Sequence, residues 1–409
     1  MMNYKRYKIY GWMILCLFIF VACNDKGIPQ DHKYPDDQQG IEEEVGKEPG
    51  STPAEKEPDE IVDPIQVIID EMTLETKIGQ VIMPAFRRDK NNQPIQAIDE
   101  TVKKQIEKYQ PGGIILFKEN IDTVEQVKKF IHDLQQISHI PLFIGIDEEG
   151  GMVSRLHGSG KIPATRLPGN YAIGETKDPM VAYDTGKILG QELFNLGFNM
   201  NFAPVADLWT NPNNTVIGKR SFGSDPELAG EMVAAMVKGL QEENISSVIK
   251  HFPGHGDTNL DSHHNQVIVD YSKEELEKRE WIPFRKGIEA GANGIMIAHI
   301  HLPQVIHGDI PATFSKEIME KVLRQELGHE QLLITDALDM GAISKHWSGS
   351  EACIKAFEAG ADILLMPASL QEGYEGLLKA VEEGQITEER LNQSVHRILK
   401  VKKERGLLP

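Results

Sequence analysis

Residues 247–264 read SVIKHFPGHGDTNLDSHH, and this stretch carries most of the information about the fold. It begins with a short apolar run, 247–249, which is typical of a buried strand bounded by turn residues. The run passes directly into a segment where glycine and proline fix an irregular loop that positions four histidines and two aspartates. A buried strand that ends in positioned polar groups indicates a parallel α/β architecture.

Seven more apolar runs lie on either side of this strand, at 81–84, 113–117, 142–146, 200–205, 294–298, 332–335 and 362–366. Helical periodicity separates them, at 124–136, 180–195, 227–242, 273–289, 315–326, 350–359 and 370–383, with a last helix expected at 387–404. Strict alternation predicts parallel strands joined by crossover helices. Eight units predict an α/β fold with a single (β/α)8 TIM-type barrel. An open doubly wound sheet fits less well, because no GxGxxG motif follows the first run.

Polar side chains stand at the ends of five of these runs, where the working residues of such barrels gather. They are Asp147, Glu148 and Glu149 after the third run, Asp207 after the fourth, Lys250 and His251 after the fifth, His299 and His301 after the sixth, and Asp336 after the seventh. A single polar residue after a strand is easily explained as a helix cap. Polar residues after five strands, all at the same end of the expected barrel, instead favour a functional site.

The first 60 residues have a different character. Three basic residues precede the mostly apolar stretch 9–22, which is too short for a typical spanning helix and typical of a signal peptide. The stretch ends in FVAC, at 20–23, and resembles the bacterial lipoprotein box. We therefore expect 1–22 to be a lipoprotein-type signal peptide and Cys23 to carry lipid. The alternative is an ordinary cleaved signal that happens to contain a cysteine.

Residues 23–60 are rich in proline, glycine and acidic side chains, and we expect an acidic disordered linker there, followed by a catalytic barrel over 61–409. The whole chain has 43 basic and 62 acidic residues and a formal charge of −19. This charge disfavours nucleic acid as a partner, since phosphate neutralisation dominates that affinity.

Six segments together identify the chain as similar to glycoside hydrolase family 3, in its β-N-acetylhexosaminidase branch. They are KHFPGHGDTNLDSH at 250–263, GGIILFKEN at 112–120, IDEEGGMVSR at 146–155, NFAPVADLW at 201–209, GKRSFG at 218–223 and ITDALDMGAI at 334–343. The resemblance spans roughly residues 65–405.

The resemblance implies a retaining double displacement. It implies that Asp336 is the nucleophile and that His263, paired with Asp261, is the general acid/base. It implies sugar contacts from Asp147, Arg155, Arg220, Lys250 and His251. The chemistry is consistent with these roles, since a histidine titrates near neutral pH and an aspartate can hold its tautomer.

Several residues also have a purely structural interpretation. Asp336 could cap a helix, His263 could be a surface histidine, and Lys250 could be only an ion-pair partner of Asp147. Asp339 is interpreted as a supporting group and His255 as a brace for its loop. For Asp207, His299 and His301, structural and sugar-binding roles both stay open.

The function predicted from these residues is removal of terminal β-linked N-acetylglucosamine from peptidoglycan fragments. We expect no cofactor and no metal, a monomer, and an exported protein tethered by lipid to the outer face of the cell membrane. Two alternatives stay open: a phosphorylase of the same family and a non-catalytic sugar-binding lipoprotein. A family 3 β-glucosidase is disfavoured, and so is a zinc hydrolase, because glycine and proline place its histidines on an irregular loop. The zinc ligands would come from His251, His255, Asp257, Asp261 and His263.

Overall fold

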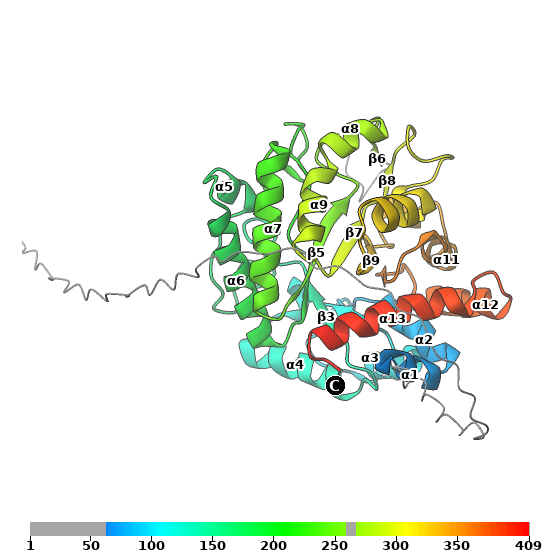
Figure 1. Ribbon diagram of the computed structural model, residues 1–409. Helices are drawn as coiled ribbons and strands as arrows, with labels where there is room; N and C mark the ends of the chain where they lie inside the picture. Colours follow the sequence, from blue (N-terminus) through cyan, green and yellow to red (C-terminus); the bar gives the residue numbers. More distant parts are fainter. Residues whose placement is uncertain (1–62, 259–266, 409) are drawn as a thin grey trace, which may run out of the picture. The chain divides into compact units, whose positions relative to one another are not determined.

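The computed structural model describes residues 63–258 and 267–408, which belong to one compact unit, Ile61–Pro409. Strands alternate with helices along it, and the helices surround the strands (Figure 1). The alternating strands are β1 (Ile82–Met83), β2 (Gly113–Ile115), β3 (Phe143–Ile146), β4 (Met200–Asn201), β5 (Ser246–Phe252), β7 (Gly294–Ile297), β9 (Leu332–Thr335) and β10 (Leu364–Leu365).

Helices precede the first strand, separate the strands from one another and follow the last strand. They are α1 (Pro64–Glu71), α2 (Leu74–Gln80), α3 (Glu100–Tyr109), α4 (Val124–Gln136), α5 (Asn170–Gly174), α6 (Pro179–Leu196), α7 (Pro226–Glu242), α8 (Lys273–Lys278), α9 (Trp281–Glu289), the π-helix η5 (Glu317–Glu326), α10 (Gly341–Ser344), α11 (Gly349–Ala359), α12 (Leu370–Glu382) and α13 (Glu388–Glu404). Helices α6, α7 and α9 pack side by side along one side of the sheet (Figure 1).

The main sheet is parallel and curled. Within the described residues, six strands pair in the order β2-β3-β4-β5-β7-β9, and β1 pairs separately with β10. Several backbone hydrogen bonds connect the two sets, and one from each junction serves as an example. The amide of Ile115 donates to the carbonyl of Pro84 at 3.1 Å, and the amide of Thr335 donates to the carbonyl of Ile363 at 3.1 Å.

The strands form where the sequence predicts them because they are buried. Every residue of β3, β5, β7 and β9 is buried, and parallel strands that are buried on both faces are built largely from apolar runs. Each of the eight predicted runs overlaps one of the strands named above. An α/β fold with a curled parallel sheet is thereby confirmed, while closure into a barrel stays a prediction.

The prediction of one helix over 273–289 is wrong. Two helices, α8 and α9, occupy this stretch and are separated at Arg279 and Glu280. The cause is Pro283, which has no amide hydrogen to donate to the carbonyl of Arg279 and whose ring would clash with it in a continuous helix. The break places Glu280 and Trp281 in the interior, where they are 2% and 0% exposed.

Several short elements were not anticipated from the sequence, namely α1, α2, α3, α5, α10 and the pair β6 (Val267–Ile268) and β8 (Ile300–His301). Helix α3 follows Asp99, whose carboxylate accepts the amide of Val102 at 2.7 Å as an N-cap. Strands β6 and β8 form a small parallel sheet of their own. Among the described residues, none of the helices has the length and apolar composition that crossing a bilayer requires.

Candidate active site

One cavity of about 310 Å³ lies among residues that follow the strands. Its volume is within the range of sites that bind small molecules. All the described residues with a predicted catalytic or sugar-binding role line it, namely Asp147, Arg155, Arg220, Lys250, His251 and Asp336. Residues as far apart in the sequence as Asp147 and Asp336 are thus brought to one site by the order of the strands.

An irregularity in β5 places Lys250 and His251. The register between β5 and β7 shifts between Ile249 and Phe252, so that β5 has one residue more than its neighbour at this point. Such a bulge redirects side chains that would otherwise follow the alternation of the strand. Here it directs two consecutive polar side chains into the cavity.

Lys250 is held by two carboxylates. Its Nζ lies 2.7 Å from Oδ1 of Asp147 and 2.7 Å from Oε1 of Glu149, and its side chain is only 2% exposed. A buried ammonium is tolerated when it is paired, because the pairing offsets the lost hydration. The ion pair with Asp147 therefore exists, and Lys250 also faces the cavity.

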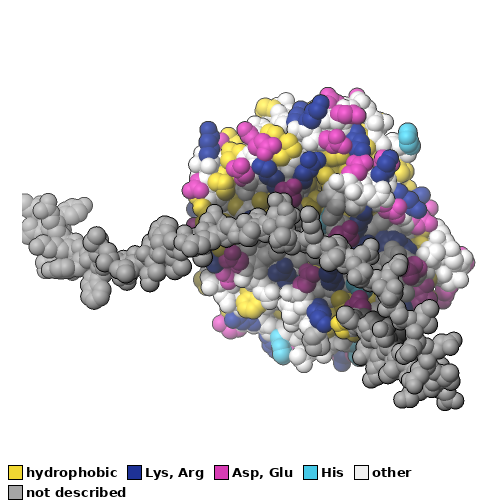
Figure 2. Space-filling model, viewed as in Figure 1, with side chains coloured by type: hydrophobic (Ala, Val, Ile, Leu, Met, Phe, Trp, Pro, Cys, Tyr) yellow, Lys and Arg dark blue, Asp and Glu magenta, His cyan; other side chains and the backbone are white. Residues whose placement is uncertain are grey.

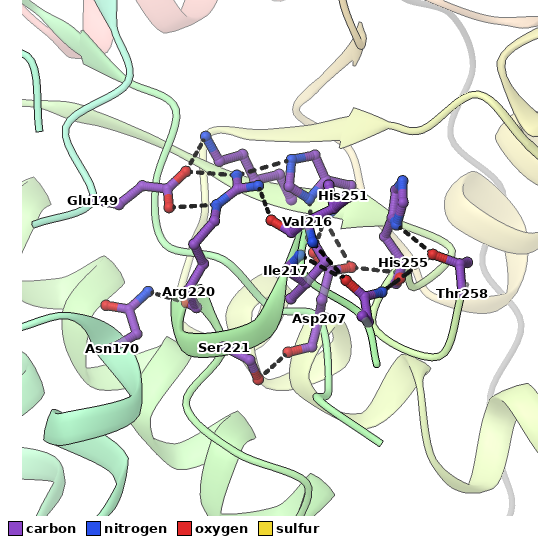
Figure 3. A network of polar contacts seen from close by, with 12 residues as sticks. Glu149, Asn170, Asp207, Val216, Ile217, Arg220, Ser221, His251, His255 and Thr258 are labelled. Atoms are coloured by element: carbon purple, nitrogen blue, oxygen red, sulfur yellow. Dashed lines mark hydrogen bonds and ion pairs between the residues drawn. The ribbon is translucent and has the colours of Figure 1, made fainter. Parts of the chain in front are cut away.

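Glu149 and Arg220 form a buried bidentate pair. Nε and Nη2 of Arg220 donate to the two carboxylate oxygens of Glu149 at 2.9 and 2.8 Å (Figure 3). Burial opposes ionisation of Glu149, but the Arg220 and Lys250 cations outweigh it and hold the pKa of that carboxyl below its usual range. Arg220 is further fixed by donating from Nη1 to the carbonyl of Val216 at 3.0 Å.

Asp207 orients His251 from the side opposite Arg220. Its Oδ2 lies 2.7 Å from Nδ1 of His251, and its Oδ1 accepts the backbone amide of His255 at 2.7 Å (Figure 3). Burial disfavours the Asp207 carboxylate, but the His251 ring outweighs this and lowers its pKa. Nε2 of His251 lies 3.4 Å from Nη2 of Arg220. A guanidinium can only donate, so Nε2 accepts and Nδ1 carries the hydrogen given to Asp207.

Asp336 lies directly after β9. Its amide donates to the carbonyl of Ile297 at 2.9 Å, and its Oδ1 accepts the amide of Ala337 at 2.8 Å. The next helix, α10, begins five residues later and has Met340 at its N-cap position. Asp336 is therefore not a helix cap. Asp339 also lines the cavity but is exposed.

The predicted acid/base pair, Asp261 and His263, lies outside the described residues, as does Cys23. The structure does describe the residues that flank the pair. Asp257 accepts hydrogen bonds from the hydroxyl of Thr210 at 2.7 Å and from the hydroxyl of Tyr271 at 2.6 Å. The two sides of the segment 259–266 are thereby linked to each other.

The family model for the glycosyl hydrolase family 3 N terminal domain matches residues 73–401. The chain belongs to glycosyl hydrolase family 3. This confirms the family resemblance seen in the sequence, and the matched range contains every described residue of the candidate site.

Several known proteins resemble the chain over most of its length. Beta-hexosaminidase A of Pseudoalteromonas piscicida is 35% identical over 368 residues, which cover 81% of this chain and 61% of that protein. Beta-hexosaminidase of Nitrosomonas eutropha is 32% identical over 311 residues, covering 73% of this chain and 87% of that protein. The solved structure of a glycoside hydrolase family 3 beta-N-acetylglucosaminidase from Paenibacillus sp. str. FPU-7 is 40% identical, with a TM-score of 0.78, over 82% of this chain and 63% of that one. The chain thus spans about three fifths of the first relative and of the solved structure.

Three histidines, His255, His299 and His301, make contacts that support the local structure. His299 contacts the hydroxyl of Thr313 at 2.7 Å through Nδ1 and the carbonyl of Ala337 at 2.9 Å through Nε2, and it does not line the cavity. His301 pairs with Asp309 at 3.1 Å and does not line it either.

His255 braces its loop through its carbonyl, which accepts Nδ2 of Asn214 at 2.8 Å, and it also lines the cavity. Burial lowers the pKa of its imidazole.

The sequence analysis placed Glu149 among the polar strand ends but assigned it no role in the site. Asp147, Glu148 and Glu149 are consecutive acids, yet each has different partners. Oε2 of Glu148 accepts the amides of Arg155 and Leu156 at 2.6 and 2.8 Å and so shapes the loop after β3. No local pattern indicates which of the three acids pairs with Arg220. Among the described residues, no three His, Cys, Asp or Glu side chains are grouped so that they could hold a metal ion.

Proposed function

We propose that the chain is a retaining β-N-acetylglucosaminidase that removes terminal β-linked N-acetylglucosamine from cell-wall fragments. The observation that carries this proposal is the cavity itself, where the carboxylate of Asp336 shares one space with fixed donors and acceptors for sugar hydroxyls. Membership of family 3 and the names of the relatives support it.

In the proposed mechanism Asp336 attacks the anomeric carbon and forms a covalent glycosyl-enzyme. The hydrogen bond from the Ala337 amide fixes one of its oxygens. His263 protonates the departing oxygen and then removes a proton from the incoming water, while Asp261 fixes its ring. Asp336 attacks from the face opposite the leaving oxygen, and water then displaces Asp336 from the face that the leaving oxygen left, so two inversions retain the β-configuration.

The sugar is oriented by charged side chains that are themselves fixed. Lys250 and Arg220 keep donors for hydroxyls while paired with carboxylates, and Asp147 keeps an acceptor. His251 is locked by Asp207 with its Nε2 toward Arg220. Groups held in place before the substrate arrives need little reorganisation in the transition state.

We also propose that the curled sheet closes into a single eight-stranded barrel. The pairing of β1 with β10 and the hydrogen bonds Ile115–Pro84 and Thr335–Ile363 support closure at both junctions. The catalytic barrel would then occupy 61–409, after a signal peptide at 1–22 and a linker at 23–60, and act as a monomer.

A panel of aryl glycosides tests the reaction class. We expect cleavage of the β-N-acetylglucosaminide, with kcat/KM at least about a hundredfold above the matching β-glucoside and β-xyloside, because a missing polar contact in a fitted site costs that much or more. Adding phosphate should leave the rate unchanged and yield free sugar. A rate that depends on phosphate and yields a sugar phosphate would identify the phosphorylase instead, and no turnover would favour a sugar-binding protein.

We propose in addition that lipid on Cys23 anchors the mature protein to the outer face of the cell membrane. The FVAC box and the acidic segment after it support this. Cys23→Ser should move the protein from the membrane to the soluble fraction when cells are fractionated, because it removes the site of lipidation. If both forms stay equally membrane-associated and neither carries lipid, the anchor is wrong.

A further inference from the structure

Glu280 lies directly behind the turn that carries His251 and His255. The break between α8 and α9 directs this residue inward, and it is 2% exposed. A methyl group added at Gly254 would lie 3.0 Å from both Cβ and Oε2 of Glu280, so the two residues pack against each other. The front of the turn lines the candidate active site, and its back is therefore covered in part by one carboxyl group.

Aromatic contacts fix the start of α9 in this place. The ring centre of Trp281 lies 5.5 Å from that of Phe252, and the ring centre of Phe284 lies 5.1 Å from it. All three side chains are 0% exposed. Buried aromatic pairs of this kind hold α9 against the end of β5. Glu280 is therefore kept at the turn by its neighbours in the sequence.

The carboxyl group of Glu280 is incompletely paired. Its Oε1 accepts a hydrogen bond from Nη2 of Arg279 at 3.0 Å, whereas its Oε2 is buried and has no hydrogen-bond partner among the described residues. Figure 2 shows acidic side chains beside basic ones over the visible surface, where water hydrates their charge. Glu280 lacks this hydration, and a buried charge without full pairing is costly. The neutral, protonated form costs less.

Other carboxylates near Glu280 also disfavour its ionisation. The charged and titratable groups on the elements packed around it are Arg279, Asp207, Asp257, Tyr271, His251 and His255. Burial raises the pKa of Glu280 to about 7, the carboxylates of Asp207 and Asp257 add to this effect, and Arg279 opposes it. The side chain of Arg279 is 40% exposed and also lies over the ring of Tyr271, at 5.0 Å.

We propose that Glu280 is a positioning residue, which in its protonated form holds the turn at Gly254 so that His251 contacts the sugar. This inference rests on the proposed function, which makes His251 a sugar contact. Ionised Glu280 would add a third carboxylate charge near Asp207 and Asp257, in a place that water does not reach. Because α9 is fixed on β5, the turn is the part that would shift. Turnover should therefore fall as Glu280 loses its proton.

The test follows kcat/KM against pH for an aryl β-N-acetylglucosaminide with a very acidic phenol. Such a leaving group needs no protonation, so the titration of His263 should not limit the first step. In wild type kcat/KM should fall about tenfold between about pH 6 and about pH 8.5, because an acid with a pKa of about 7 is mostly ionised at the higher pH. Glu280→Gln, which keeps the shape of the neutral acid, should retain the wild-type value at about pH 6 and lose most of the fall.

Two further variants serve as controls. Glu274→Gln removes an exposed carboxyl group of α8 and should leave the wild-type pH profile intact. Glu280→Ala removes the contact with Gly254 and should lower kcat/KM at both pH values. A fall of equal size in wild type and in Glu280→Gln would overturn the proposal, and so would a wild-type profile in Glu280→Ala.

Hydrogen exchange separates this inference from the proposed function, because it needs no turnover. After correction for the intrinsic pH dependence of exchange, the amides of residues 251–257 should exchange up to about tenfold faster at about pH 8.5 than at about pH 6 in wild type, in proportion to the ionised fraction of Glu280. Glu280→Gln should show no such difference. If exchange behaves in this way and wild type cleaves no N-acetylglucosaminide, the proposed function alone is refuted. Equal exchange in both proteins at both pH values would show that protonation of Glu280 does not hold the turn.

Discussion

Asp336→Asn is expected to lower kcat on an aryl β-N-acetylglucosaminide by at least about three orders of magnitude, a typical loss when an essential nucleophile is removed. The physical reason is that an amide cannot form the glycosyl-enzyme. The shape of the site should persist, because the amide oxygen of asparagine can still accept the hydrogen bond from Ala337 that fixes Asp336. Steady-state kinetics, with circular dichroism to check folding, measures the effect.

Asp339 provides the matched control, since it also lines the cavity but is exposed. Asp339→Asn should cost less than about tenfold, as expected for a supporting group outside the bond-making step. A 2-fluoro glycoside should trap the intermediate, and peptide mass spectrometry should find the sugar on Asp336. Sugar found on Asp339 or on another carboxylate would show that the nucleophile is assigned wrongly.

His263→Ala is expected to be severely impaired on a natural disaccharide, by about two to four orders of magnitude, and much less so in forming the glycosyl-enzyme from an aryl glycoside with a very acidic phenol. Protonation matters most when the leaving oxygen is a strong base. With the acidic phenol the first step stays fast, while the second step lacks its base. A burst of phenol in stopped-flow absorbance should therefore precede slow turnover.

Variants of two residues near His263 serve as comparisons in this test. Asp261→Asn should show a milder form of the same leaving-group dependence, because it disturbs the histidine without removing it. His264→Ala removes an adjacent imidazole and should leave both rates near wild type. Equal slowing of good and poor leaving groups by His263→Ala, with no burst, would exclude His263 as the acid.

Much of the fold could be predicted from the sequence because strands buried on both faces are mostly apolar and stand out as short apolar runs. Helix α4 coincides with its predicted bounds, since its apolar positions and the Thr123 cap agree. The prediction of one helix over 273–289 failed because the apolar periodicity continues across the break, whereas Pro283 interrupts the backbone hydrogen bonds. Strands β6 and β8 have two residues each and lie outside the eight apolar runs that alternate with helices, so the alternation did not indicate them.

The candidate site was predictable in its residues but not in its contacts. Position at a strand end suggested that Asp147, Lys250 and Asp336 share one cavity, and they do. The partners of Glu149 depend on where Arg220 lies, 71 residues further along the chain. The residues next to Glu149 in the sequence do not indicate a partner so far along the chain. The roles of Asp261 and His263 stay predictions, because they lie outside the described residues.

Asp147, Lys250, Glu149, Arg220 and His251 form an unbroken chain of polar contacts from one wall of the cavity to the other. Single substitutions in such a chain do not act independently, since each leaves a neighbour with altered charge balance. The second loss in a double variant should therefore cost far less than the first. Evolutionary change at these positions is then expected to need paired replacements, which makes this wall of the cavity hard to alter one residue at a time.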